Sequence, residues 1–302
     1  MNALALVTDE ASLPDDYDMR LLLDACRAVG FAAEVRSWED PAVDWSDFDA
    51  VLLRSPWSYV DKLPDFLEWC ERVSAATRLL NPLPVVRWSL DKHYLADLAA
   101  YGVPVVPSSF VAPGADPLAA LREFLTAHPR TEEVVVKPTV GAYSRDVRRF
   151  PRSCESEAVR HMTELTGKGH HAILQPYLTS IDRDGESDLI YFDGSYSHAI
   201  RKNALLMSDG TAGAPTFESR RARDADEDER AVASAALGAA ASHLGLEQAL
   251  LYARVDLVRD DDGKPMVLEL ELCEPSLNLP FTEGGATRFA RALAARLNPR
   301  GR

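Results

Sequence analysis

The stretch that decides the fold is a pair of runs, Tyr252-Ala-Arg-Val-Asp-Leu-Val258 and Met266-Val-Leu-Glu-Leu-Glu-Leu272. Both runs are apolar or β-branched at most positions, which is typical of β-strands. Between them stands Asp262-Gly263, the kind of dipeptide that a two-residue hairpin turn prefers. The runs therefore predict an antiparallel hairpin, and its register decides which side chains share a face.

The register of this hairpin gathers carboxylates. A two-residue turn places Asp256 opposite Glu269 and Arg254 opposite Glu271. Directly opposite residues share one face with Cβ atoms about 5 Å apart, and residues two apart on a strand also share a face. A hard cation such as Mg2+, which binds carboxylate and phosphate oxygens, would explain three acids together. An amphipathic strand with solvated glutamates explains the Leu-Glu-Leu-Glu pattern equally well, and the hairpin alone leaves both interpretations open.

Composition limits the classes of protein to consider. The chain has 302 residues, 46% of them hydrophobic, which is enough for two or three cores. Its formal charge of −14, with scattered lysines and arginines, argues against a nucleic-acid partner. No apolar run approaches the roughly 20 residues that span a bilayer, and the short N-terminal apolar run lacks a basic flank. The four cysteines show neither zinc spacing nor a C-x-x-C pair. We expect a cytoplasmic protein without a membrane partner.

Three regions are predicted along the chain. Residues 1–88 alternate strand and helix, which is typical of a small parallel α/β domain, and the turn after the first strand lacks the glycines of a dinucleotide-binding loop. Ser89 is a candidate N-cap for a helix from Leu90 to Tyr101. We expect a small α+β lobe over residues 89–177 and a larger lobe over residues 178–302.

Six short motifs then follow one another, and each is too degenerate to decide a function alone. They are Asp91-Lys92, Val134-Val-Val-Lys-Pro138, Ile173-Leu-Gln-Pro-Tyr-Leu178, Gly185-Glu186, Ser197-His-Ala-Ile-Arg-Lys202, and Arg254-Val-Asp256 with Glu269-Leu-Glu271. In this order they resemble the ATP-grasp ligases, especially the glutathione synthetase-like members. The resemblance implies an ATP-grasp fold behind an N-terminal Rossmann-like domain, with ATP and Mg2+ as cofactors and a homodimer as the assembly.

The resemblance also implies roles for individual residues. Arg201 and Arg254 would stabilise the transferring phosphoryl group, a task that suits a guanidinium. The carboxylates Asp256, Glu269 and Glu271 would bind magnesium. The implied ATP contacts are Lys92, Lys137, Ser144, Gln175, Pro176, Tyr177, Leu178 and Glu186. Without the resemblance, Lys92, Glu186 and Arg201 would be interpreted as solvated charges.

The sequence departs from the family pattern in two places. The loop from Thr139 to Asp146, which closes over the phosphates in the family, has Gly141 as its only glycine. Its flexibility is therefore open, although Ser144 and backbone amides can still cap a phosphate. At the last metal position the family often has Asn, whereas this chain has Glu271.

The substrate is expected beside the first domain. Arg54, Ser55 and Trp57 follow its third strand, and ligands of open α/β sheets bind at such carboxyl ends. Trp57 fits equally well as a residue that packs the domain interface. Glu274 and Ser276, directly after the metal strand, would add polar contacts to a small amino-acid-like substrate.

These residues favour one function and leave alternatives. The family reaction activates a carboxylate-like group as an acyl phosphate, which an amine captures. The segments Arg54–Tyr59 and Glu269–Ser276 resemble a small branch of cyclo-ligases that closes O-ureido-D-serine to D-cycloserine. The activated ureido acyl group would there be attacked by the substrate's own amine, so intramolecular cyclisation is the specific hypothesis. The alternatives are a ligase that joins two amino-acid-like molecules, a non-catalytic ATP-binding regulatory protein, and a small-molecule kinase.

Overall fold

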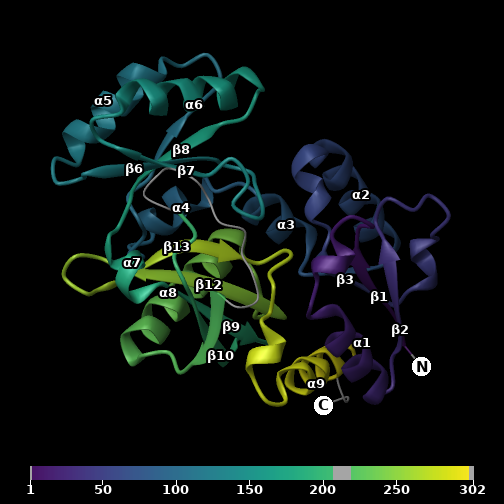
Figure 1. The fold of residues 1–302 in the computed structure, drawn as a ribbon. Helices are drawn as coiled ribbons and strands as arrows, with labels where there is room; N and C mark the ends of the chain where they lie inside the picture. The colour runs from purple at the N-terminus through teal and green to yellow at the C-terminus, as the bar shows by residue number, and fades with distance from the viewer. Residues whose placement is uncertain (1, 207–218, 299–302) are drawn as a thin grey trace.

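The computed structural model describes residues 2–206 and 219–298, which form a mixed α/β fold with three sheets (Figure 1). The strands of each sheet come from one continuous part of the chain. The mixed α/β class is therefore confirmed. Within the described residues, no helix is both long and apolar enough to cross a membrane.

The first sheet is parallel and has the strand order β2-β1-β3-β4. Its central strands are buried on both faces, as parallel strands usually are. Leu4, Leu6 and Leu52 pack with α1 on one face, whereas Val51 and Leu53 pack with α2 on the other. The elements are β1 (Ala3–Thr8), η1 (Leu13–Asp15), α1 (Met19–Ala28), β2 (Ala32–Ser37), η2 (Trp45–Asp47), β3 (Ala50–Ser55), η3 (Trp57–Asp61), α2 (Leu63–Ala76) and β4 (Arg78–Leu80).

The second sheet also has four strands, but it is antiparallel, with the order β5-β8-β6-β7. Apolar side chains of α5 and α6 cover one of its faces, and they form a separate core around Phe124, Val136 and Met162. The elements are β5 (Ser109–Val111), α5 (Pro117–Ala127), β6 (Glu133–Pro138), β7 (Arg148–Pro151), α6 (Glu155–Gly167) and β8 (Ala172–Pro176).

The predicted helix from Leu90 to Tyr101 is wrong in its start. The structure has two helices here, α3 (Leu83–Ser89) and α4 (Tyr94–Ala100). Pro84 lies in the first turn of α3, a position that proline tolerates well. Ser89 ends that helix, and its buried hydroxyl makes no hydrogen bond, so it is not an N-cap.

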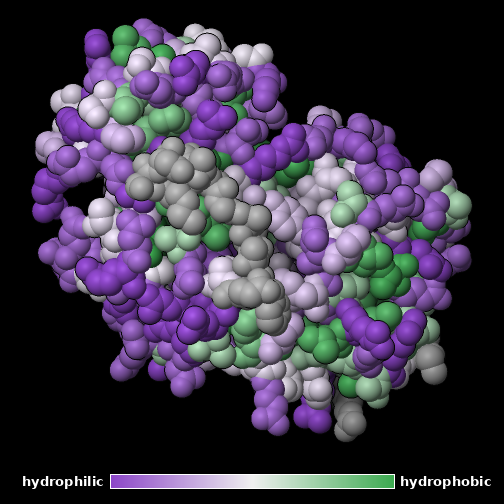
Figure 2. Space-filling view, viewed as in Figure 1, coloured by the Kyte–Doolittle hydropathy of each residue, from purple (hydrophilic) through white to green (hydrophobic). Residues whose placement is uncertain are grey.

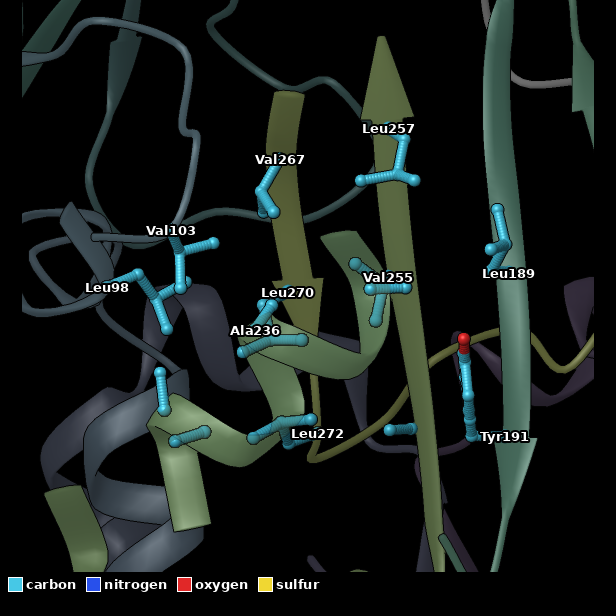
Figure 3. Packing of buried hydrophobic residues seen from close by; sticks show 14 of the residues in the cluster. Leu98, Val103, Leu189, Tyr191, Ala236, Val255, Leu257, Val267, Leu270 and Leu272 are labelled. Carbon is cyan, nitrogen blue, oxygen red and sulfur yellow. The ribbon is translucent and has the colours of Figure 1, made fainter. Parts of the chain in front are cut away.

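The third sheet is antiparallel, with the order β11-β10-β9-β12-β13. One face packs against α4 and α8 through Leu98, Val103, Ala236, Val255 and Leu270 (Figure 3). The opposite face is divided: Ile190, Phe192 and Tyr252 pack with α9, whereas Asp188, Arg254 and Asp256 line the cavity described below. The elements are α7 (Ser180–Asp184), β9 (Glu186–Phe192), β10 (Ser195–Lys202), β11 (Arg220–Arg223), α8 (Glu227–Leu244), β12 (Tyr252–Arg259), β13 (Pro265–Glu271), η5 (Leu279–Phe281) and α9 (Gly285–Leu297).

The β12–β13 hairpin has the predicted register at its polar end, but a different turn. Asp260 N donates to Lys264 O at 2.9 Å, so the loop has three residues and Gly263 adopts a positive φ of 79°. This shifts the pairing by one residue near the turn. The register shifts back between Leu257–Val267 and Asp256–Glu269, which leaves Leu268 as an extra, bulged residue on β13. The predicted two-residue turn is wrong, and the bulge restores the predicted pairs.

Buried polar side chains tie the first domain to this hairpin. The amide of Asn81, which is 1% exposed, donates to Tyr252 O at 2.9 Å and to Leu272 O at 2.8 Å, and it accepts from Leu251 N at 3.0 Å. The fully buried Tyr252 hydroxyl lies 3.0 Å from Leu80 O. The position of the hairpin relative to the first sheet is thus fixed by hydrogen bonds as well as by packing.

Candidate active site

A cavity lies where the three sheets meet, and residues from all three parts of the chain line it. Figure 2 shows the face of the molecule indented between the small lobe of α5 and α6 and the first domain. Its lining combines apolar side chains, among them Val106, Ile181, Val258 and Leu268, with charged residues from the third sheet and from the loops around it.

The acidic face predicted from the hairpin register is confirmed in its pairing. Asp256 lies opposite Glu269 and Arg254 opposite Glu271. One oxygen from each of the three carboxylates lies within 4.8 Å of the others. Arg254 donates to both oxygens of Asp256, at 2.7 and 2.9 Å, and also to Glu271. The donor set consists only of oxygens, which fits Mg2+.

The carboxylates of this face differ in pKa because their neighbours differ. Burial raises the pKa of Glu271 to about 8, with Asp256 and Glu269 adding to the effect of burial against Arg254. Burial also raises the pKa of Glu269, but Lys92 and Lys137 outweigh it, and the pKa falls to about 2. Glu269 is thus held as a carboxylate, whereas Glu271 lacks sufficient positive charge nearby. A divalent cation would supply that charge.

Two buried lysines stand above the acidic face. Lys92 Nζ lies 2.7 Å from Glu269 Oε1, and it also donates to Gly141 O at 3.3 Å. Lys137, which is 7% exposed, ends β6 and lines the cavity. Burial lowers the pKa of Lys137. An anionic ligand such as a polyphosphate would restore the balance of charge around these ammonium groups.

A second group of carboxylates lies on β9 and β12, and the ammonium group of a lysine is its cationic neighbour. Glu186, Asp188 and Asp256 also bring carboxylate oxygens within 4.8 Å of one another. Lys202 Nζ lies 2.5 Å from Glu186 Oε2 and 3.8 Å from Asp188 Oδ1. Burial lowers the pKa of Lys202, but Asp188 and Glu186 raise it by more, so the ammonium stays protonated.

The structure does not bring Arg201 to the cavity. Lys202 lines the cavity, and successive residues of a strand point to opposite faces. Arg201 instead donates to Arg183 O outside the cavity. Sequence reasoning missed Lys202, although it ends the same motif and the alternation along β10 could have identified it. Asp188 and Arg220, which also line the cavity, had no motif to mark them.

The segment expected to bind adenine lines the cavity. All four of its predicted residues belong to the lining, as do Ser144 and Glu186. Gln175 Nε2 donates to Ser108 Oγ at 2.9 Å, and the Tyr177 ring stacks under Arg149 at 3.5 Å. These contacts fix the segment Gln175, Pro176, Tyr177 and Leu178.

The segment after β13 is held by side chains on both sides of its backbone. Five successive carbonyl groups, from Cys273 to Leu277, each accept a hydrogen bond from a different side chain. The donors, in order, are Tyr252 at 2.7 Å, Trp57 at 3.1 Å, Arg54 at 2.7 Å, Arg254 at 3.1 Å and His198 at 2.9 Å. The carboxylate of Asp18 accepts from the N–H groups of Leu277, Asn278 and Leu279 at 2.6, 3.1 and 2.8 Å.

These bonds place the predicted substrate residues in two groups. Trp57, Glu274 and Ser276 line the cavity. Arg54 and Ser55 are fully buried and do not line it, since Arg54 donates to Pro275 O and the Ser55 hydroxyl donates to Thr8 Oγ1 at 2.8 Å. Arg54 therefore supports the segment that carries Glu274 and Ser276 and does not face the cavity.

Comparison with known proteins agrees with this fold. The family profile described as "D-cycloserine synthetase DcsG, N-terminal domain" matches residues 4–81. The cycloserine biosynthesis protein DcsG of Streptomyces lavendulae is 62% identical over 299 residues, which cover 99% of this chain and 100% of that protein. The crystal structure of the D-cycloserine synthetase DcsG superposes with a TM-score of 0.95 over 98% of this chain and 99% of the other.

More distant structures share the fold. The ATP-grasp ligase PsnB, solved with a minimal precursor, Mg and ADP, is 18% identical, covers 98% of both chains and has a TM-score of 0.62. The fold is that of the ATP-grasp ligases, as the motifs predicted. Within that class, the chain belongs to the DcsG family of D-cycloserine synthetases.

The two neighbours on β10 give a matched test of the site. We expect Lys202→Met to lower the rate of ATP turnover by more than about 100-fold, because the transferring phosphate loses a buried cation. Arg201→Met should stay within about threefold of the unchanged protein, since surface charges contribute little. The rates are measured as magnesium-dependent ADP release, with thermal unfolding as the control for folding. Equal losses in both variants would contradict the placement of Lys202.

His198, which donates to Leu277 O in the segment after β13, should make the stability of the fold depend on pH. Burial lowers the pKa of His198 to about 4, below the value of about 6.5 in an unfolded chain. Between these values the unfolded chain binds the proton more tightly, so stability falls as the pH falls. From pH 7 to pH 5 this one group should lower the free energy of unfolding by about 2 kcal/mol.

Urea unfolding at both pH values checks this. His198→Asn, whose amide can still donate to Leu277 O, should lose that part of the pH dependence. His170→Asn, at an exposed position, is the control and should keep it. An unchanged pH dependence in His198→Asn would show that His198 is not buried in its neutral form.

Proposed function

We propose that the protein uses ATP to activate the carboxylate of a small amino acid and closes that molecule on itself. The observation that carries the proposal is the chain of contacts within the cavity lining. Lys92 contacts Glu269 on the acidic face, and Arg254 joins the carboxylates of Asp256 and Glu271 to Ser276 O. The structure that superposes over nearly the whole chain is that of a D-cycloserine synthetase, so O-ureido-D-serine and D-cycloserine are the proposed substrate and product.

Activation falls on the carboxylate and not on the ureido acyl group of the sequence hypothesis, because the carbonyl group of the product ring comes from the carboxylate. The reaction balances in three steps. A carboxylate oxygen of O-ureido-D-serine attacks the γ-phosphorus of ATP, and ADP leaves. The nitrogen bound to the side-chain oxygen then attacks the acyl carbon, so that phosphate leaves and the five-membered ring closes. Water removes the carbamoyl group from that nitrogen as carbamate, which decomposes to carbon dioxide and ammonia. No nucleophilic side chain of the protein is needed.

The described residues position these groups and neutralise their charge, as phosphoryl transfer generally requires. Lys92 and Lys137 would bind ATP phosphates, and Lys202 would contact the γ-phosphate that is transferred. Arg254 lies between the acidic face and Ser276 O, where it can donate to the acyl phosphate. Magnesium held by Asp256, Glu269 and Glu271 would neutralise phosphate charge.

Each region of the chain would contribute one part of the site. Residues 1–88 would support the substrate, residues 89–177 would cover the nucleotide, and residues 178–302 would carry the magnesium ligands. The relatives that bind nucleotides support ATP as the partner. A homodimer in the cytoplasm is the assembly that we propose, which light scattering of the purified protein would test.

Release of ADP with a single substrate tests the proposal. Purified protein with ATP, Mg2+ and O-ureido-D-serine should form one ADP per D-cycloserine, without any added amine. ADP is measured by a coupled assay and the ring product by mass spectrometry. ADP release that requires a separate amine would favour an intermolecular ligase. ATP binding without ADP release would favour a regulatory protein, and a stable phosphorylated product would favour a kinase.

A further inference from the structure

The loop between β6 and β7 has an unusual backbone for its sequence. Tyr143, Ser144 and Asp146 have φ values of 56°, 55° and 59°, although none of them is glycine. Side chains rarely adopt this left-handed region, and such residues persist where surrounding contacts hold them. The loop therefore needs external contacts to keep this conformation.

Contacts at its base account for part of this. His161 Nε2 donates to Asp146 O at 2.8 Å, and the His161 side chain is 2% exposed. Within the loop, Arg145 N donates to Ala142 O at 3.1 Å. The first bond fixes the end of the loop that lies on the small lobe, and the second closes the turn at its tip without attaching the tip to another part of the molecule.

The tip of the loop contacts the first domain. The ring of Tyr143 meets the ring of Trp57 edge to face, with centroids 4.7 Å apart and an interplanar angle of 86°. Beside it, Arg145 Nη1 lies 2.6 Å from Asp61 Oδ2. Trp57 is itself fixed, since its indole donates to Glu274 O at 3.1 Å. The tip of the loop thus packs against an aromatic side chain of the first domain that is itself held in place.

Both rings line the cavity beside the residues expected at its substrate end. Trp57, Tyr143, Arg220 and Ser276 all belong to that lining. Tyr143 is 45% exposed, so a large ring is placed over the cavity and not buried in a core. Burial, followed by the nearby Asp15 and Asp16, raises the pKa of the Tyr143 phenol, which therefore stays neutral.

We propose that Trp57 and Tyr143 form a roof that closes the substrate end of the cavity over a small amino acid and keeps water from its activated carboxyl group. The inference rests on the proposed function, because an acyl phosphate is what water would destroy. Without the roof, water attacks the acyl carbon, phosphate leaves, and the substrate returns unchanged with ATP converted to ADP and phosphate. The roof would make ring closure faster than this hydrolysis.

The ratio of ADP to ring product measures this protection directly. We expect Tyr143→Ala to raise the ratio from one by roughly two- to tenfold, the range that one aromatic pair contributes. Tyr143→Phe keeps the ring and should keep the ratio near one. Tyr101→Ala, at a 51% exposed tyrosine outside the cavity lining, is the matched control and should also leave the ratio unchanged.

The ion pair beside the roof gives a second, independent test. Arg145→Asp should raise the ratio by placing two acids together, and adding Asp61→Arg should restore it. A loss of stability alone would lower the rates of ADP and product formation equally and would leave their ratio at one.

Three results would overturn the inference. The first is a ratio that stays at one in Tyr143→Ala while ADP release continues, which would leave the proposed function standing. The second is a charge exchange that restores nothing. The third is a failure of the protein without substitutions to release ADP with the substrate, which would overturn the proposed function as well.

Discussion

The site depends on the contact between Arg254 and the carboxylates of Asp256 and Glu271. Among the described residues, six acidic and six basic side chains line the cavity, and most of the carboxylates have a cationic neighbour within the protein. Removing one partner from a buried pair of this kind costs about 3–5 kcal/mol. In the proposed site, nucleotide and metal would bind by exchange: phosphates would replace the carboxylate beside Lys92, and Mg2+ would replace Arg254 beside Asp256 and Glu271. This exchange would free Arg254 to face the substrate.

The rest of the fold determines which side chains of the hairpin and of the following segment face the cavity. The bulge at Leu268 keeps Val267 and Leu270 in the core while Glu269 and Glu271 face the cavity. Beyond the sheet, the backbone of the segment after β13 is held by hydrogen bonds from Arg54 and Trp57 of the first domain and from His198 of β10. Glu274 and Ser276 thus reach the cavity on a backbone that cannot easily shift. The first domain contributes to the site mainly by holding this segment.

Much of this could be predicted from the sequence, because strand alternation is a strong signal. The hairpin alone predicts the observed pair Asp256 and Glu269. The three-residue turn and the bulge at Leu268, neither of which is predicted, shift the register by one residue in opposite directions, so their effects cancel. The motif order predicted the fold. Arg54 was not predicted to be buried, since a sequence does not show that a carbonyl such as Pro275 O needs a donor. The choice between Arg201 and Lys202 required the face of β10, which a short motif does not give.

The central claim is that the acidic face binds the metal of a metal–nucleotide complex in place of Arg254. Crystals of the protein grown with Mn2+ and a non-hydrolysable ATP analogue would test it through the anomalous scattering of manganese. The account predicts an anomalous peak within coordination distance of Asp256, Glu269 and Glu271, with the Arg254 guanidinium turned away from Asp256. A bound nucleotide whose metal lies elsewhere, with Arg254 still paired to Asp256, would contradict it.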